Sequence, residues 1–454
     1  MGYMAAELTY PQHLRALLVL GLPLIGSNLA QFAISLTDAV MLGWYDVEAL
    51  AGQVLGSTVF FILFLFGSGF ALAVMPMIAT AAASGEERQV RRVTRMGLWQ
   101  AAAFGVLTLP VFLASGPLLR AAGQADSAAQ LAHQYLVING WAMVPALIVM
   151  VLKSYLAALE RTRVVLWVTL GAVGVNILVN YALIFGNWNA PELGIRGAAI
   201  ASLVVHIASM LALVAYAAWA TPEHTIFQRL WRPDWEAAVQ VFRLGWPIGL
   251  TSLAEVGLFG AASLMMGWLG TLPLAAHGIA LQIASATFMA HLGLSSAVTV
   301  LAGKALGQRN EANLRRTAIV GITLSMSLAG ATMVLFFAMP ETLIGLFLDP
   351  ADPARSDVMA IAVGLLAAAA VFQVADSAQV MALGLLRGVQ DTRVPMVMAG
   401  ISYWLVGMPV AYALGFVLDM GGVGIWLGLA AGLALAGVLM MTRFWRGRAR
   451  LARS

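Results

Sequence analysis

The sequence is divided into long apolar segments that short, charged connections separate. A helix needs about 20 apolar residues to cross the hydrocarbon core of a bilayer. Charged residues make up 10% of this chain, against about a quarter in a soluble domain, so lipid must be its main solvent. We therefore expect twelve membrane-spanning helices, near residues 14–42, 50–80, 93–115, 128–157, 163–187, 197–219, 237–267, 273–302, 315–339, 357–386, 394–418 and 422–443.

The apolar segments favour helices over a membrane β-barrel, because they are continuous and do not alternate with polar residues. The fold class is thus an all-α polytopic membrane protein. No cysteine is present, so disulfides are excluded. His13 and Arg15 precede the first apolar run, but no small-residue cleavage site follows it, and we expect this helix to be retained.

The basic residues indicate how the helices are oriented. All but three of the 25 lie in connections on one side, and Arg120, Arg196 and Arg355 lie on the other. The positive-inside rule then puts both termini in the cytoplasm of a bacterial-type inner (plasma) membrane. The basic tail WRGRARLAR at residues 445–453 fits a topology anchor at a lipid surface, so no nucleic-acid partner is expected.

An internal repeat divides the chain into two halves. LGLP at 20–23 matches LGWP at 244–247, MLGW at 41–44 matches MMGW at 265–268, and the interval between the copies is the same in both pairs. Six spans lie between the copies, so the copies share one orientation and are related by a pseudo-two-fold axis along the membrane normal. We predict two six-helix lobes, residues 1–225 and 226–454, with a substrate path at the interface between the repeats.

Three carboxylates lie inside predicted spans: Asp38, Glu255 and Asp376. No basic residue is predicted at a comparable depth to pair with them. A charge at the middle of a membrane helix costs at least ~2.5–3.5 kcal/mol. Each acid must therefore be protonated, bind a cation or face a wet cavity. The plainer alternative is a neutral acid bonded to a nearby carbonyl.

Neighbouring polar residues make two cation sites plausible. Asn176 and Asn180 are four residues apart, so their amides share a helix face. If that face meets Asp38, the three oxygens suit a hard cation, although amides also join membrane helices without binding anything. Glu255 and Asp376 belong to the same lobe and would titrate as a coupled pair if they share a site.

Other residues could line a substrate cavity, namely Gln31, His206, His277, Gln282, Phe372, Gln373 and Gln379. His277 could relay protons, but a hydrogen-bonded packing histidine is the more common case. The chain has no phosphate-binding, zinc-protease or serine-hydrolase motif, so an enzyme is not expected. Without an ATP site, transport would be driven by an ion gradient.

Several of these segments resemble the MATE family of exporters, closest to its NorM branch. LGLPLIGSNLAQFAISLTDAVMLGW and LGWPIGLTSLAEVGLFGAASLMMGWLG resemble the paired first and seventh helices of that family. LAAHGIALQI with LSSAVTVLAGKALGQRN resembles the eighth helix and its loop, and VFQVADSAQVMALGLLRGVQDTR resembles the tenth. The likeness covers essentially the whole chain.

The resemblance implies multidrug efflux by alternating access between two lobes, with small cationic drugs or dyes exchanged for Na⁺ or H⁺. It implies cation-binding roles for Asp38, Asn176, Asn180, Glu255 and Asp376, Na⁺ being held by the three acids if Na⁺ is the coupling ion. No further cofactor is implied, and we expect a monomer. NorM-type members often have a tyrosine four residues before the tenth-helix acid, whereas this chain has Phe372. A hydroxyl ligand is missing there, so the choice between Na⁺ and H⁺ stays open.

Two alternatives are weighed against export. A lipid-linked oligosaccharide flippase of the same superfamily would carry phosphates, so intramembrane arginines would be expected. None of the 25 basic residues is predicted at mid-span. A membrane scaffold or receptor would need a soluble domain or long loops, and the longest predicted connection is about twenty residues.

Overall fold

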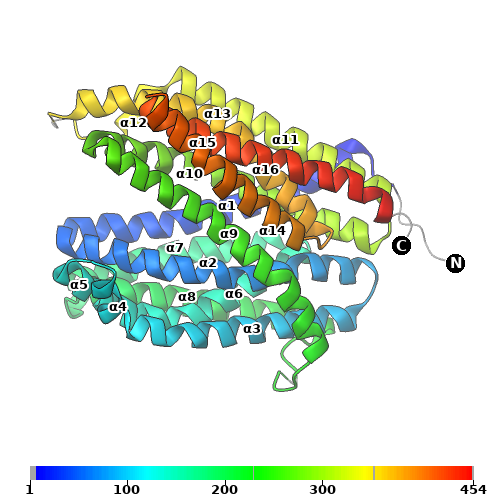
Figure 1. Cartoon of the computed structure of the whole chain (residues 1–454). Coiled ribbons are helices and arrows are strands. Elements are labelled where there is room, and N and C mark those ends of the chain that lie inside the picture. The colour runs from blue at the N-terminus through cyan, green and yellow to red at the C-terminus, as the bar shows by residue number, and fades with distance from the viewer. Residues whose placement is uncertain (1–6, 229, 351–352, 452–454) are drawn as a thin grey trace. The chain divides into compact units, whose positions relative to one another are not determined.

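The computed structural model describes residues 7–228, 230–350 and 353–451, and these fold into helices joined by short connections (Figure 1). Twelve of the described segments are long and apolar enough to cross a membrane. They are α1 (Tyr10–Tyr45), α2 (Val47–Ala83), α3 (Glu87–Leu113), α5–η1–α6 (Asp126–Ala158), α7 (Thr162–Phe185), α8 (Ile195–Ala220), α9 (Trp235–Leu269), α10 (Thr271–Gly307), α11 (Glu311–Ala338), α13 (Arg355–Gly388), α14–η4–α15–η5 (Arg393–Val417) and α16 (Gly421–Leu451). The twelve predicted spans are confirmed.

Two of the spans are interrupted within the membrane. The fourth consists of α5 (Asp126–Asn139), η1 (Gly140–Ala142) and α6 (Met143–Ala158). The eleventh consists of α14 (Arg393–Gly400), η4 (Ile401–Gly407), α15 (Met408–Tyr412) and η5 (Ala413–Val417), in which η4 and η5 are π-helical. Among the described residues of the connections, four short helices occur: α4 (Ser115–Ala121), η2 (Asn187–Asn189), η3 (Pro222–His224) and α12 (Pro340–Gly345).

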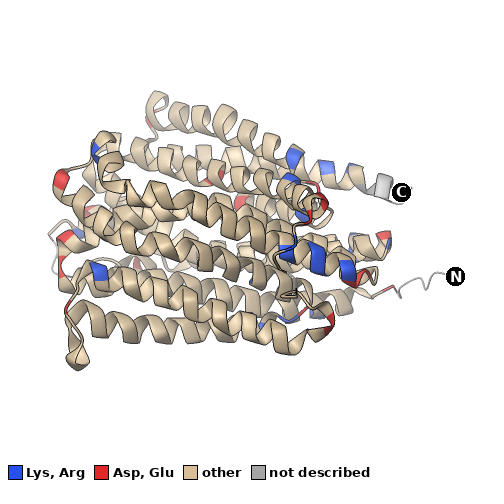
Figure 2. Cartoon of the chain, turned by 90° about the horizontal axis from the view of Figure 1, so that it is seen from below, with Lys and Arg blue, Asp and Glu red and all other residues tan. Residues whose placement is uncertain are grey.

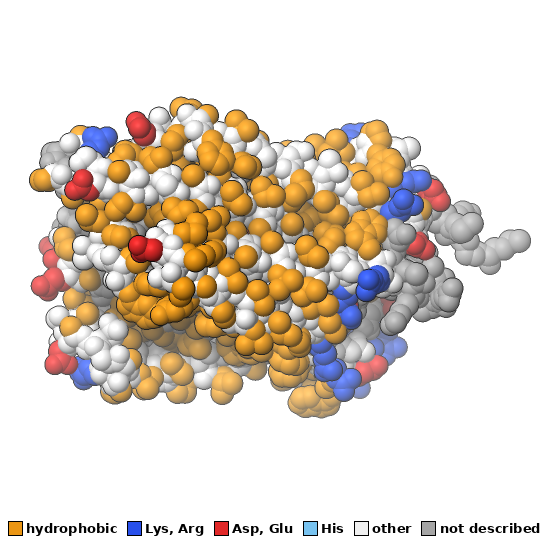
Figure 3. All heavy atoms as spheres, turned by 45° about the horizontal axis from the view of Figure 1, so that its top comes forward, with side chains coloured by type: hydrophobic (Ala, Val, Ile, Leu, Met, Phe, Trp, Pro, Cys, Tyr) orange, Lys and Arg blue, Asp and Glu red, His pale blue; other side chains and the backbone are white. Residues whose placement is uncertain are grey.

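The outward-facing side chains match a lipid environment. Large apolar residues in the middle of spans are exposed, for example Leu107 (72%) and Leu405 (71%). Lys, Arg, Asp and Glu lie mostly at helix ends and in connections, and hydrophobic side chains cover most of the face in Figure 3 (Figures 2 and 3). Strongly exposed tryptophans lie near helix ends, as expected at a membrane interface: Trp44, Trp167, Trp188, Trp219, Trp231, Trp235 and Trp268.

The helices pack into two compact units. One unit contains Gly26–Gly249, and the other contains the residues up to Ile25 together with those from Leu250 onward. Helices α1 and α9 therefore each begin in one unit and end in the other. The lobes that the sequence predicts, 1–225 and 226–454, stay a prediction.

The internal repeat is visible in how these helices pack. On α2, a Cβ at Gly69 would collide with the backbone of Gly245 and Gly249 in the first half of α9. On α10, a Cβ at Gly293 would collide with Ile25 in the first half of α1. Gly69 and Gly293 are separated by the interval of the repeat. Each repeat thus uses a glycine to bring the first half of the other repeat's first helix into backbone contact.

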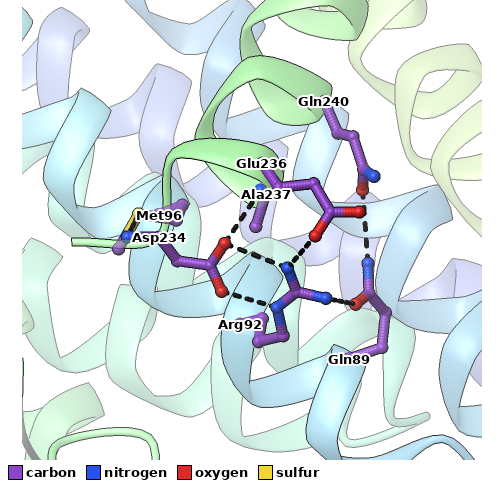
Figure 4. A network of polar contacts seen from close by, with 7 residues as sticks. All are labelled: Gln89, Arg92, Met96, Asp234, Glu236, Ala237 and Gln240. Atoms are coloured by element: carbon purple, nitrogen blue, oxygen red, sulfur yellow. Dashed lines mark hydrogen bonds and ion pairs between the residues drawn. The ribbon is translucent and has the colours of Figure 1, made fainter. Parts of the chain in front are cut away.

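A pair of arginine clamps holds the starts of α9 and α1. In the first clamp, Arg92 on α3 pairs with Asp234 at 2.5 Å and with Glu236 at 2.6 Å, and its guanidinium lies between the two carboxylates (Figure 4). In the second clamp, Arg316 on α11 bonds the Leu8 carbonyl at 2.5 Å and the Glu7 carboxylate at 2.9 Å. Because Arg92 and Arg316 are separated by the same interval as the repeated motifs, the two clamps are equivalent parts of the repeat.

The first clamp should make stability depend on acidity. The pKa of Asp234 lies below its ordinary value of 3.8, mainly because its carboxylate accepts hydrogen bonds from Arg92. Because this pKa is lower in the folded than in the unfolded protein, the ion pair stabilises the fold above pH 3.8. That stabilisation is lost as the pH falls through the pKa of the folded state. We expect Arg92→Gln to lower the free energy of unfolding at pH 7 by ~1 kcal/mol and to flatten the loss below pH 4. Thermal unfolding in detergent between pH 7 and pH 3.5 measures the loss of stability at pH 7 and its dependence on pH.

Arg88→Gln is the matched control, since Arg88 is an exposed arginine one turn earlier on the same helix. If Arg92→Gln and Arg88→Gln unfold alike across this pH range, the first clamp does not hold α9 in the way described.

Candidate functional site

Asp38 is buried between three helices of one unit. Its Oδ1 accepts hydrogen bonds from Asn176 Nδ2 at 2.8 Å and from Asn180 Nδ2 at 2.6 Å, both on α7. Its Oδ2 accepts a longer bond of 3.4 Å from Ser202 Oγ on α8. The side chain of Asp38 is placed here by α1, and the residue is only 5% exposed. The structure therefore brings together the three residues that the sequence groups at this site.

The amides face Asp38 as donors, which differs from an all-oxygen pocket. Two amide N–H groups on one carboxylate oxygen stabilise the charged form of an acid. The amide oxygens of Asn176 and Asn180 are buried and have no hydrogen-bond partner in the described part of the chain. A rotation of either amide about its last side-chain bond would turn an oxygen toward Asp38. An amide turned in this way would present an oxygen to the carboxylate in place of a hydrogen-bond donor.

The other two acids belong to the second unit. Asp376 is 2% exposed on α13, Glu255 is partly buried on α9, and each interacts electrostatically with the other. Asp376 Oδ1 and Glu255 Oε1 are both buried and without a hydrogen-bond partner among the residues described. A shared site for the two acids stays a prediction.

Two residues that the sequence analysis does not propose, Arg387 and Tyr403, interact electrostatically with these acids. Arg387 is predicted in a connecting loop, but it lies in the last turn of α13 and interacts electrostatically with Glu255. The expectation that no basic residue lies at a comparable depth to pair with these acids stays a prediction. Tyr403, on η4, is fully buried and its Oη accepts a 2.6 Å hydrogen bond from Gln379 Nε2. The intramembrane acids point to the site in the sequence, but no sequence signal marks Tyr403.

His277 is held as a neutral ring. Trp426 Nε1 donates to His277 Nδ1 at 3.1 Å, so the ring proton is on Nε2, which lies 3.0 Å from Ser263 Oγ. The Ser263 hydroxyl in turn donates to the Phe259 carbonyl. Both ring nitrogens are thus occupied, which matches a packing histidine better than a proton relay.

The remaining candidates divide into exposed and buried groups. Gln31 and Gln282 are exposed, whereas Gln373 is buried on α13 and donates to the Ala284 carbonyl at 3.2 Å. Phe372 is 2% exposed and packs edge-to-face against Phe259 and Trp426, with ring centroids 5.8 and 5.3 Å apart. Position 372 therefore belongs to an aromatic cluster beside His277.

No group of three or more His, Cys, Asp or Glu side chains that could hold a metal ion occurs in the described ranges. A cation near Glu255 and Asp376 would have only two carboxylates, so neutral oxygens would have to complete its shell. Hydroxyl and amide oxygens are suitable ligands for a hard cation.

A family model described as MatE matches the chain twice, over residues 23–182 and 247–413. The chain belongs to the MATE family. The two matches begin at Pro23 and Pro247, which are the equivalent prolines of the repeated motifs LGLP and LGWP. Together with the twelve apolar helices, the match identifies a multi-pass membrane protein of a family of membrane transporters.

Curated relatives cover nearly the whole chain. A probable multidrug resistance protein NorM of Rhizobium meliloti (strain 1021) is 46% identical over 440 residues, which are 96% of this chain and 94% of that protein. A NorM protein of Pseudomonas putida is 38% identical over 95% of this chain and 94% of its own length. The chain is thus similar to NorM proteins, as its motifs suggested.

Solved structures share the fold at low sequence identity. A MOP superfamily transporter from Pyrococcus furiosus, described as having a binding pocket of reverse polarity, matches with a TM-score of 0.87 at 19% identity, over 99% of this chain and all of that one. The eukaryotic MATE transporter AtDTX14 matches with a TM-score of 0.87 at 18% identity, over 98% and 99% of the two chains.

The amides of α7 should stabilise Asp38 measurably. We expect Asn180→Leu to lower the free energy of unfolding by ~1–3 kcal/mol, because a buried carboxylate loses its shortest donor. In an Asp38→Asn background the same change should cost less, since no charge remains to be stabilised. Thermal unfolding of the two single variants and the double variant gives the coupling energy.

Asn187→Ala provides the matched control, because Asn187 lies outside the cluster, on η2. A coupling energy near zero between positions 38 and 180 would contradict the arrangement described here.

Proposed function

We propose that the chain is a multidrug efflux antiporter that exports organic cations in exchange for Na⁺ or H⁺. The observation that carries this proposal is the pair of acids in the second unit, whose buried oxygens have no hydrogen-bond partner in the described residues. The names of the NorM relatives support multidrug resistance as the physiological role.

The charges of the acidic cluster favour a monovalent cation. When ionised, Glu255 and Asp376 carry two negative charges, and Arg387 supplies one positive charge. One monovalent cation would neutralise the remainder. A drug cation, a sodium ion and a proton would each serve, so they would compete for the same negative charge. Competition of this kind is the simplest basis for exchange.

Coupling further requires that the ion bind more tightly to one conformation than to the other. Helices α1 and α9 are the natural places for such a difference, because each passes from one unit to the other. Asp38 and Glu255 lie on these two helices, beyond Pro23 and Pro247 respectively. Cation uptake at either acid would therefore act on a helix that both units share, and a proline is a common site of bending.

The site in the first unit has a different chemistry. Asp38 receives amide donors on a single oxygen, which suits a carboxylate that gives up and regains a proton or a cation. We propose that Glu255 and Asp376 carry the negative charge for which drug and ion compete. Asp38 takes part in an additional cation-dependent step. An inner-membrane location with both termini in the cytoplasm follows from the basic residues of the connections.

Dye export from membrane vesicles tests the proposal. Vesicles with the purified protein are loaded with a fluorescent organic cation, and efflux is followed under an imposed Na⁺ gradient, then under a pH gradient alone. We expect at least one gradient to drive efflux. Glu255→Gln and Asp376→Asn should each slow that efflux at least tenfold, because each removes a charge that binds both ion and drug, and Asp38→Asn should slow it too.

Arg120→Gln serves as the control, since Arg120 is an exposed arginine of the other unit that pairs with Asp126 at 3.0 Å. Antiport is ruled out if neither gradient drives dye efflux, or if all three acid variants export dye at the wild-type rate.

A further inference from the structure

A cavity of about 490 Å³ lies where the ends of α13 and α16 meet the start of α14, all in the second unit. Helices α13 and α14 both pack against α16, so the three elements surround one space. Pockets that bind small molecules are usually about 300–1,000 Å³ in volume. The cavity is therefore large enough for a small molecule or a lipid headgroup. None of the three intramembrane acids is among its lining residues.

The walls of the cavity are mostly apolar. Leu386 on α13, Met398 on α14, and Leu439 and Phe444 on α16 line it. A ligand with hydrocarbon chains gains free energy when it covers such side chains, whereas a small hydrated ion gains none. The walls thus favour a ligand that has an apolar part.

Two arginines and one carboxylate supply the charge of the cavity. Arg443 and Arg446 on α16 line it together with Asp391, which follows α13. Asp391 Oδ2 accepts a hydrogen bond from Arg443 Nε at 2.6 Å, so this pair is neutral as a whole. Arg446 is exposed and forms no ion pair with any residue that the structure describes. One positive charge is therefore left over, which suits a ligand with a net negative charge.

One face of α16 leads from the apolar part of the span to the cavity. Val438, Thr442 and Arg446 follow one another at four-residue intervals, so they lie along the same side of the helix. Val438 is 64% exposed within the span, as expected of a side chain that contacts lipid chains. Thr442 and Arg446 line the cavity. This face changes from apolar to cationic in the order in which a phospholipid changes from its chains to its phosphate.

The place of the cavity along the span also fits a headgroup. The twelfth span ends at Gly447, directly after Arg446, on the side that the basic connections assign to the cytoplasm. Guanidinium groups bind phosphate oxygens through charge-assisted hydrogen bonds. Basic pockets between membrane helices on the cytoplasmic side are suited to the headgroups of anionic lipids.

We propose that this cavity binds one anionic phospholipid. Its phosphodiester lies against Arg446 and Arg443, and its acyl chains follow the apolar walls and Val438. The single net charge of phosphatidylglycerol balances Arg446. Phosphatidylcholine would bring a second cation to the arginines, and free phosphate has no apolar part for the walls. The bound lipid joins the ends of α13, α14 and α16, at a site separate from the acids that we propose for transport.

The absence of cysteine from the sequence allows a direct test, because a cysteine introduced at Thr442 is the only thiol of the chain. The Thr442→Cys protein is purified in detergent, and its alkylation by a maleimide is followed at increasing phosphatidylglycerol concentration. Phosphatidylglycerol should slow the alkylation, because the bound lipid covers position 442. Phosphatidylcholine should need an about fivefold higher concentration for the same protection, since it has no net charge to balance Arg446.

Arg446→Gln in the Thr442→Cys background tests the charge. It should raise the phosphatidylglycerol concentration for half-maximal protection about fivefold, because a basic residue near an anionic lipid contributes ~1 kcal/mol. Arg315→Gln is the matched control, since Arg315 is an exposed arginine on α11 of the same unit and does not line the cavity. It should leave the half-maximal concentration unchanged. If Arg446→Gln does not fold, Met398→Trp replaces it: the larger side chain fills the cavity without changing its charge and should remove the protection.

Inorganic phosphate as the only addition, at equal ionic strength, should not protect the thiol. If it protects as well as phosphatidylglycerol, the ligand is a free phosphate and the lipid site is overturned. Equal protection by the two lipids would overturn the selectivity for an anionic lipid. Failure of phosphatidylglycerol to protect, or a half-maximal concentration that Arg446→Gln leaves unchanged, would overturn binding at this cavity.

Discussion

A polar group in the hydrocarbon core of a bilayer has no water to bond, so the protein must supply its partners. Most of the described polar groups in the spans obey this constraint. Asp38 is met by two amides, and His277 by Trp426 and Ser263. Glu255 Oε1 and Asp376 Oδ1 do not obey it, since both are buried without a hydrogen-bond partner among the described residues. A buried carboxylate oxygen without a partner is costly, so a group from outside the chain would be stabilised at either acid.

The parts of this fold that depend on local pattern could be predicted from the sequence. Span number follows from apolar length, and the grouping of Asp38 with Asn176 and Asn180 follows from the four-residue spacing of the two amides. Tyr403 could not be found in this way, because a π-helical segment shifts its side chain out of the α-helical register. Arg387 is absent from the predicted site because the sequence places it in a connecting loop, whereas it lies in the last turn of α13.

The two repeats share their packing but not their chemistry. Gly69 and Gly293 make equivalent contacts, and Arg92 and Arg316 form equivalent clamps. At the functional positions the correspondence ends: Glu255 has Gln31 as its partner in the other repeat, and Asp38 has Ala262. Backbone contacts tolerate little change, since a larger residue would collide, whereas side chains facing a site are free to diverge. The two repeats thus share one scaffold and carry their buried acids at different positions.

The clamp at Arg316 has a consequence for how the chain is made. Leu8, just before α1, and His13, in its first turn, bond to Asn313, some 300 residues later. At about 5–20 residues per second, a ribosome needs roughly 15–60 s to cover that distance. Throughout that interval the first half of α1 is already synthesised but has neither its α11 partners nor Gly293 of α10. The first half of α1 therefore finds its native neighbours long after it is synthesised.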